Sequence, residues 1–84
     1  MYFVYILQLN NNNLYKGYTN DLNRRINEHK TGKVKSTSNH RPLKLIHYEV
    51  YSLASDALRR EKFLKTTEGI RLLKQQLRDV IKYR

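Results

Sequence analysis

An almost uninterrupted apolar run near the N-terminus constrains the fold more than any other feature of this chain. Residues 2–9, Tyr-Phe-Val-Tyr-Ile-Leu-Gln-Leu, are rich in β-branched and aromatic side chains. Continuous apolar character is typical of a strand buried on both faces, whereas a half-exposed strand alternates between apolar and polar residues. We therefore expect residues 2–9 to form the central strand of a sheet, with a partner strand on each side.

Two further segments have the composition of partner strands. Residues 14–19 follow a run of four asparagines, Asn10–Asn13, which favours a turn because asparagine tolerates left-handed backbone conformations. Residues 43–51 show a third strand pattern after a polar, basic loop over residues 31–42. A helix between the second and third strands implies a right-handed crossover that makes them parallel, with the first strand between them and antiparallel to both.

Helices complete the predicted fold, and capping residues and glycines mark their ends. They are expected from Asn20 or Asp21 to Lys30 before Gly32, from Ser52 or Ser55 to Thr66 before Gly69, and from Ile70 to Tyr83. We predict a single α+β domain over residues 1–84. Its three-stranded, mainly antiparallel sheet is flanked by three helices in the order β-β-α-β-α-α.

The charge of the chain indicates a polyanionic partner. Seventeen Lys+Arg against seven Asp+Glu give a net charge of +10 at pH 7, and nucleic acid is the commonest polyanion that such a field attracts. A basic but inert surface is the alternative. No acidic residue lies between Glu28 and Glu49, so we expect this segment to follow phosphates of the nucleic-acid backbone through Lys33, Lys35, Arg41 and Lys44.

Other bulk features exclude several classes of protein. The absence of cysteine excludes disulfides and thiolate metal sites. No apolar run reaches the length of about 18 residues that a membrane span needs. The strand pattern at the N-terminus has no basic region before it, unlike a secretory signal peptide. We expect a soluble cytoplasmic protein without a membrane partner.

Glu61 is the most informative single residue. It falls on the inward stripe predicted for its helix, Ala54, Ala57, Leu58 and Leu64, where a carboxylate is costly unless a cation or hydrogen bonds satisfy it. One interpretation is an i,i+4 salt bridge to Lys65. The other is a ligand for a hard cation such as Mg²⁺, which often takes only one or two carboxylates.

Four further side chains are candidates for chemistry. Arg25 and His29 are four residues apart and share a helix face. They are either a solvated arginine and a core histidine, or a phosphate ligand and a proton relay. Tyr5 and Tyr15 are either packing residues or a site in which a cation and neighbouring Lys or Arg side chains lower the pKa of a phenol from its usual value of about 10.

These residues, in this order, resemble the GIY-YIG endonuclease family. The resemblance extends from Tyr2 to about Leu77. The chain is similar in particular to small stand-alone members of the family and to the catalytic module of the bacterial nuclease that acts in DNA excision repair. It is carried by Tyr5, the segment Leu14-Tyr15-Lys16-Gly17, Arg25, His29 and Glu61. The chain departs from the family pattern at Phe3-Val4-Tyr5, which keeps only the tyrosine, and at Lys16, where isoleucine is usual.

The resemblance implies that the protein hydrolyses DNA phosphodiester bonds with one Mg²⁺ or Mn²⁺ ion. It assigns general-base catalysis to Tyr5, orientation or sharing of that role to Tyr15, close approach to Gly17, stabilisation of phosphate charge to Arg25, assistance to His29 and metal binding to Glu61. Branched or structured DNA and a protein partner are candidate sources of specificity. One rival function is a nucleic-acid-binding domain that keeps this fold with little or no activity. Another is a structural subunit of a larger ribonucleoprotein, for which the high positive charge would suffice.

A shared tyrosine site sets a condition on the hairpin. Directly paired residues of two antiparallel strands point to the same face of the sheet. If Leu9 paired with Leu14, Tyr5 would share a face with Lys16 and Tyr18, so Tyr5 and Tyr15 meet only in a shifted register, for example with Leu7 paired with Tyr15 and Tyr5 with Gly17. This register predicts an odd-length connection or a bulge near Asn10–Asn13. A glycine within a strand also indicates a bulge or the close approach of another group.

Overall fold

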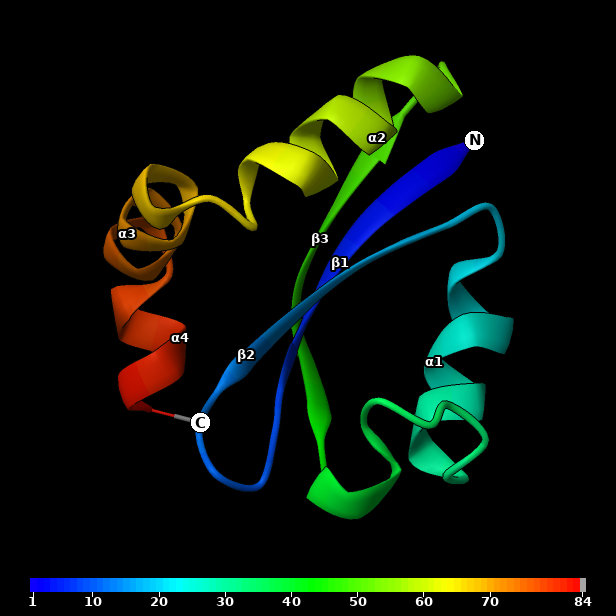
Figure 1. The fold of residues 1–84 in the computed structure, drawn as a ribbon, viewed down its shortest axis with the longest axis vertical. Coiled ribbons are helices and arrows are strands. Elements are labelled where there is room, and N and C mark those ends of the chain that lie inside the picture. Colours follow the sequence, from blue (N-terminus) through cyan, green and yellow to red (C-terminus); the bar gives the residue numbers. More distant parts are fainter. Residues whose placement is uncertain (84) are drawn as a thin grey trace.

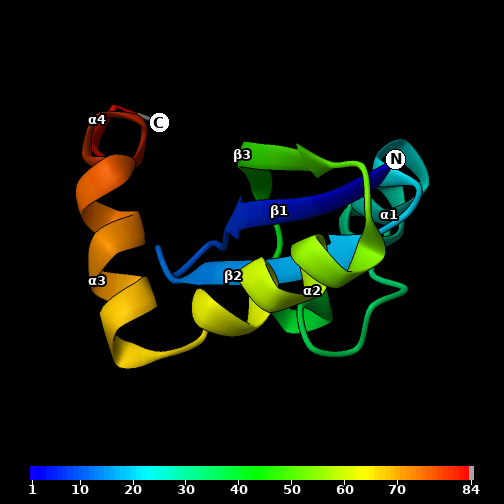
Figure 2. The same cartoon turned by 90° about the horizontal axis from the view of Figure 1, so that it is seen from above.

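The predicted sheet topology is confirmed. The structure is a computed structural model that describes residues 1–83. Strand β1 (Tyr2–Gln8) lies between β2 (Leu14–Thr19) and β3 (Lys44–Tyr51) and is antiparallel to both. Figure 2 shows β3, β1 and β2 following one another across the sheet.

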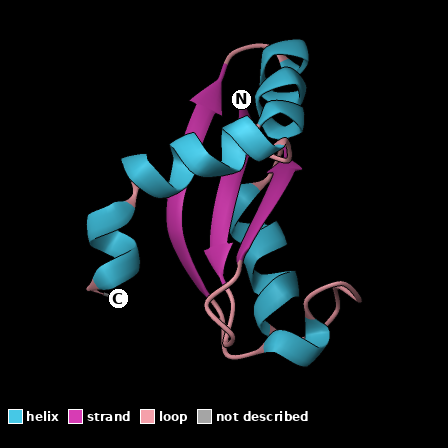
Figure 3. Ribbon diagram, turned by 60° about the vertical axis from the view of Figure 1, so that its left-hand side comes forward, coloured by secondary structure: helices cyan, strands magenta, loops and turns pink. Residues whose placement is uncertain are grey.

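Helices cover both faces of the sheet. Helix α1 (Leu22–Lys30) lies on one face, and α2 (Ala54–Phe63), α3 (Thr67–Gln76) and α4 (Arg78–Lys82) lie on the other (Figures 1 and 3). A short 3₁₀ helix, η1 (Ser38–His40), interrupts the loop that joins α1 to β3. No helix within residues 1–83 has the length and apolar character needed to cross a membrane.

The two faces of β1 pack into two separate cores, which explains its continuous apolar sequence. Val4 and Ile6 are fully buried among residues of α2 and α3. Tyr5 and Leu7 are buried on the opposite face, where they pack with Ile26 of α1. Successive strand residues point to opposite faces, so every side chain from Val4 to Leu7 enters a core.

The hairpin has the register that a shared tyrosine site requires. Tyr5 pairs with Gly17 and Leu7 pairs with Tyr15. The connection between Gln8 and Leu14 comprises residues 9–13, an odd number, as predicted. It closes through a hydrogen bond from the Leu9 N–H to the Asn13 carbonyl, and Asn12 takes the left-handed conformation with φ 70°.

The caps of α1 are those predicted from the sequence, whereas the cap predicted for α2 is absent. The Asp21 side chain accepts from the Arg24 N–H at the start of α1, and Gly32 is left-handed after its end. Helix α2 begins after Leu53 without a side-chain cap and ends at Phe63, so the predicted cap at Ser52 or Ser55 is wrong. The predicted inward position of Leu58 is also wrong. Helix α2 packs through Ala57 and Leu64, and Leu58 is 46% exposed.

Gly69 and the last predicted helix also need correction. Gly69 does not end α2 but lies in the first turn of α3, where Thr66 caps it by accepting from the Gly69 N–H. A side chain at Gly69 would overlap the Phe63 carbonyl, so close packing of the two helices explains this glycine. The helix expected from Ile70 to Tyr83 is divided between α3 and α4, because Leu77 leaves helical geometry at φ −103° and ψ 18°.

Candidate active site

The hydroxyl of Tyr5 begins a buried hydrogen-bonded chain that joins β1 to α1 and to the following loop. Tyr5 Oη lies 2.8 Å from His29 Nε2, and His29 Nδ1 lies 2.8 Å from Thr37 Oγ1. All three residues are at most 1% exposed. The sheet and α1 therefore hold the Tyr5 oxygen in one position without help from solvent.

The chain of donors and acceptors assigns the tautomer of His29. The Thr37 hydroxyl donates to the Val34 carbonyl at 3.5 Å, so its oxygen is available to accept from His29 Nδ1–H. The Nε2 atom is then an acceptor, and the Tyr5 hydroxyl donates a hydrogen bond to it. The remaining lone pairs of the Tyr5 oxygen can accept a proton from another molecule.

Burial and neighbouring charges set the ionisation of this pair. Burial, with the positive charge of Arg25 acting in the same direction, lowers the pKa of His29 from 6.5 to about 4, so the ring is neutral at pH 7. Burial raises the pKa of Tyr5 above 10.0 despite the nearby Arg25 guanidinium, which lowers it. Arg25 alone therefore does not produce the lowered Tyr5 pKa that the sequence suggested.

The neutral His29 predicts acid sensitivity of the fold. Between pH of about 6.5 and 4 the unfolded chain binds a proton at this histidine and the folded chain does not, so stability falls as the pH is lowered. The free energy of unfolding should decrease on the order of 3 kcal/mol across this window from His29 alone. Urea unfolding at a series of pH values measures it.

Histidine variants isolate this contribution from that of the carboxylates. His29→Gln should flatten the pH dependence between 6.5 and 4, whereas His40→Gln, which removes a histidine outside the hydrogen-bonded chain, should leave it unchanged. Equal slopes in the wild type and the His29 variant would show that His29 is not held neutral by the fold.

Gly17 allows the Tyr5 ring to lie on the backbone of β2. A Cβ atom at this position would overlap the ring and the hydroxyl of Tyr5. Gly17→Ala should therefore displace the ring from His29 and cost about 1–3 kcal/mol of unfolding free energy through overpacking. Urea unfolding measures this loss.

A double-mutant cycle supplies the control for Gly17. In a Tyr5→Leu background the ring is gone, and Gly17→Ala should cost less than in the wild type. The same cost in both backgrounds would mean that the two residues do not contact each other.

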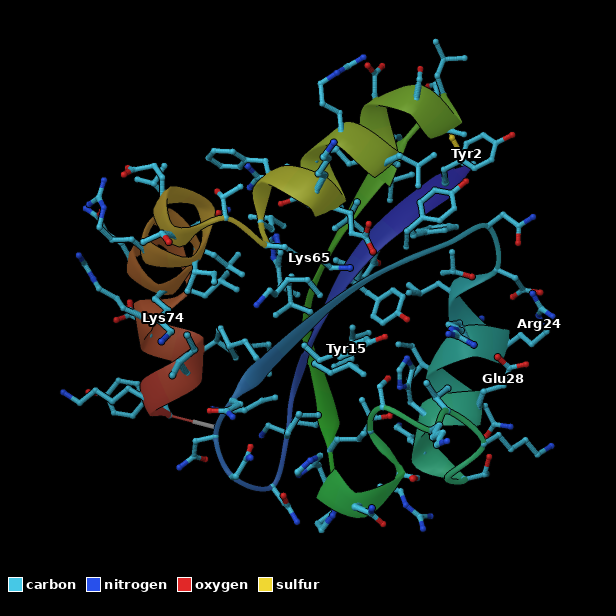
Figure 4. The ribbon with its side chains drawn as sticks, in the orientation of Figure 1. Tyr2, Tyr15, Arg24, Glu28, Lys65 and Lys74 are labelled. Carbon is cyan, nitrogen blue, oxygen red and sulfur yellow. The ribbon has the colours of Figure 1, made fainter. Side chains whose placement is uncertain are left out.

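Tyr15 completes an aromatic cluster on the α1 side of β2 (Figure 4). Its ring centroid lies 5.1 Å from that of His29 in an edge-to-face arrangement and 6.4 Å from that of Tyr5. The two tyrosines thus share one face, as the register requires. Tyr15 is only partly buried, so the cluster is open to solvent on its side.

Arg25 supplies the positive charge beside Tyr5. Its guanidinium donates to Glu28 Oε1 at 3.1 Å, and its side chain is 35% exposed. Hydrogen bonding to Tyr5, and then to Glu28, raises the pKa of Arg25 above its usual value, so the guanidinium stays charged. An arginine that is fixed on one side and accessible on the other can bind two phosphate oxygens at once.

Glu61 approaches this cluster from α2. Its side chain is 20% exposed and receives a hydrogen bond from Lys65 at 3.1 Å, so the salt bridge considered from the sequence is present. Its negative charge also raises the pKa of Tyr5, although burial contributes most to that shift. Glu61 is thus the carboxylate of α2 whose charge acts on Tyr5, although α2 itself packs against the opposite face of the sheet.

The oxygen donors fit a hard cation and do not fit zinc. Within residues 1–83 no group of three His, Cys, Asp or Glu side chains could hold a metal ion, and zinc sites use three or four such ligands. Glu49, on β3, is saturated by Arg60, Tyr51 and His47. Mg²⁺ and Mn²⁺ often bind through only one or two carboxylates together with water and substrate phosphate, so a single carboxylate such as Glu61 fits these ions better than it fits zinc.

Comparison with known proteins decides the family. Residues 1–74 match the family described as the GIY-YIG catalytic domain. The chain belongs to the GIY-YIG family. Members of this family are nucleases that act on DNA, and the matched region contains every candidate site residue and ends within α3.

Relatives of similar size share most of the chain. UPF0213 protein SERP0126 of Staphylococcus epidermidis is 44% identical over 66 residues, covering 77% of this chain and 80% of that protein. UPF0213 protein SA0446 of Staphylococcus aureus is 38% identical over 79 residues, covering 89% and 96%. The solution structure of UPF0213 protein BH0048 from Bacillus halodurans is 31% identical, with a TM-score of 0.58 over 90% of this chain and 85% of that one.

The basic residues assigned to substrate contacts lie in the loop that carries Thr37 and at the start of β3. Lys33, Lys35 and Lys44 are exposed in the loop after α1 and at the start of β3. Arg41 donates to the carbonyls of Ser38 and Lys30, at 3.0 and 3.4 Å, and so ties the loop to the end of α1. Their contacts with nucleic acid stay a prediction.

Two residues of the GIY-YIG site were missed from the sequence. Glu28 could have been found, because its i,i+3 spacing from Arg25 favours an ion pair. Thr37 had no such signal, since it lies in an irregular loop whose path places its hydroxyl at His29. Both act through a neighbour: Glu28 orients Arg25, and Thr37 orients His29.

Proposed function

We propose that this chain is an endonuclease that hydrolyses DNA phosphodiester bonds with one Mg²⁺ or Mn²⁺ ion held at Glu61. One observation supports it best: the Tyr5 hydroxyl is hydrogen-bonded to a neutral His29 and lies beside Arg25, in a chain that belongs to a nuclease family. A general base, a proton acceptor behind it and a cationic phosphate ligand are the groups that this hydrolysis needs.

Tyr5 acts as the general base in this proposal. Its own proton already points to His29 Nε2, so its oxygen accepts the proton of an attacking water while its proton moves to His29. Burial is the main cause of the lowered pKa of His29, and the positive charge of Arg25 is the second. A phosphate bound at Arg25 would offset the effect of that charge. The substrate thereby makes His29 a better proton acceptor when it is needed.

Arg25 and Glu61 handle the charge of the phosphate. Arg25, fixed by Glu28, binds phosphate oxygens as their negative charge rises. Glu61 would hold the cation together with water and the substrate. When bound, the cation would stabilise negative charge on the phosphate and on the leaving oxygen. Tyr15, packed on His29, keeps the ring of His29 in line with Tyr5.

A panel of DNA substrates tests the function against its rival. Supercoiled plasmid, branched and single-stranded DNA are incubated with the protein in Mg²⁺, in Mn²⁺ and in chelator, and binding is measured in parallel. We expect cleavage of at least one substrate with metal and none with chelator. Binding of DNA without cleavage in either metal would favour the nucleic-acid-binding domain instead.

A further inference from the structure

Lys16 points away from the tyrosine site. It follows Tyr15 in β2, so its side chain leaves the opposite face of the sheet. There it is half-buried, and its Nζ donates to the Leu14 carbonyl at 3.3 Å. This is the position at which the family pattern usually has an apolar isoleucine.

Two more lysines lie close to Lys16. Lys65 follows α2 and Lys74 lies on α3, and Figure 4 shows both on the side of β2 that carries α2 and α3. Burial, then the charge of Lys74, then that of Lys65, lower the pKa of Lys16. The ammonium groups of Lys74 and Lys65 are thus near enough to Lys16 to repel it.

The surface between these lysines is concave and lacks acid. A cavity of about 250 Å³ is lined by Lys16 and Lys74 together with uncharged residues of the β1–β2 turn, β2 and α3, and no carboxylate lines it. Within residues 1–83 neither Lys16 nor Lys74 forms a salt bridge, while Lys65 is paired with Glu61. Gathering unpaired cations in one place is unfavourable without an anion, which suggests that the surface binds one.

We propose that Lys16 and Lys74 bind a backbone phosphate of the DNA strand, across β2 from the phosphate that is cleaved. The site rests on the proposed function, because the strand is placed by the tyrosine site. Tyr15 and Lys16 are neighbours on the edge strand β2, so a strand that crosses this edge meets both faces. Glu61 and Lys65 lie on α2 and just after it, on the same side as Lys16.

Salt dependence of DNA binding measures this contact directly. A short fluorescent DNA duplex is titrated in chelator over a series of salt concentrations. Log affinity falls as log salt concentration rises, and the Lys16→Gln, Lys74→Gln double variant should make this slope shallower by about 1–2. A Lys62→Gln, Lys82→Gln variant removes the same charge from exposed positions outside the cavity and should change it less.

The outcomes separate this inference from the proposed function. An equal reduction of the salt dependence in the two double variants, or no reduction in either, would overturn the phosphate site. The Lys74→Gln single variant, on the exposed surface of α3, gives the same comparison if Lys16→Gln does not fold. A smaller slope in a protein that never cleaves DNA would refute the nuclease but keep the site, whereas cleavage with unchanged slopes would refute only the site.

Discussion

Replacing Tyr5 by phenylalanine should lower the rate of metal-dependent DNA cleavage by about 10²–10⁴-fold, the usual contribution of a general base. The ring would still pack between Leu7 and Ile26, so the fold should persist. Loss of the hydroxyl leaves buried His29 Nε2 without a donor, which should cost about 1–3 kcal/mol of unfolding free energy. Single-turnover cleavage and urea unfolding measure the two effects separately.

Tyr18→Phe is the matched control for Tyr5→Phe. Tyr18 lies on β2 but on the opposite face of the sheet, where its ring stacks on Tyr2. Removing its hydroxyl should leave cleavage unchanged. If Tyr5→Phe cleaved DNA at a rate similar to that of Tyr18→Phe, Tyr5 would not be the general base, and the hydrogen bond to His29 would have only a structural role.

Neutralising Glu61 should have a comparable effect through the cation. Glu61→Gln keeps the size of the side chain but removes the charge that would hold Mg²⁺ or Mn²⁺. A bound metal ion provides several kcal/mol of transition-state stabilisation, so we expect a rate loss of at least about 10²-fold at moderate metal concentration. The fold should change little, because a partly exposed pair such as Glu61–Lys65 contributes only about 0.3–0.5 kcal/mol.

Asp56→Asn controls for the loss of a negative charge from the same helix. Asp56 lies in the first turn of α2, exposed and paired with Arg59, away from the tyrosine cluster. Cleavage as a function of Mg²⁺ concentration should be displaced or abolished for Glu61→Gln and normal for Asp56→Asn. Identical metal dependence of the two variants would remove Glu61 from the metal site.

Most of the fold could be predicted because its signals are local. The double-sided apolar character of β1 places it at the centre of the sheet, and the crossover rule then determines the direction of β3. Since strands have a period of two, the requirement that Tyr5 meet Tyr15 predicted an odd-length connection in the hairpin, and the observed register is the one given as an example. Leu77 was different: both helices keep it buried, and no residue at the break predicts an end of helix α3.

The sequence predicted which residues form the candidate site, but it did not predict their ionisation states. Tyr5, Tyr15, Arg25 and His29 gather on one face as expected. The neutral state of His29 depends on burial that three segments create together, and one of them is the irregular loop that carries Thr37. No local sequence signal predicts a role for Lys16, because its neighbour Lys74 comes from α3, which is distant in the chain.

The most direct test of the shared site is the position of the cation itself. Sub-stoichiometric Mn²⁺ added to isotope-labelled protein broadens the backbone amide resonances nearest to the bound ion. We expect the strongest broadening at Glu61 and at Tyr15–Gly17, and a loss of this pattern in Glu61→Gln. Broadening centred on other carboxylates, such as Asp21 or Asp79, with no effect at Glu61 would contradict a metal site shared with Tyr5.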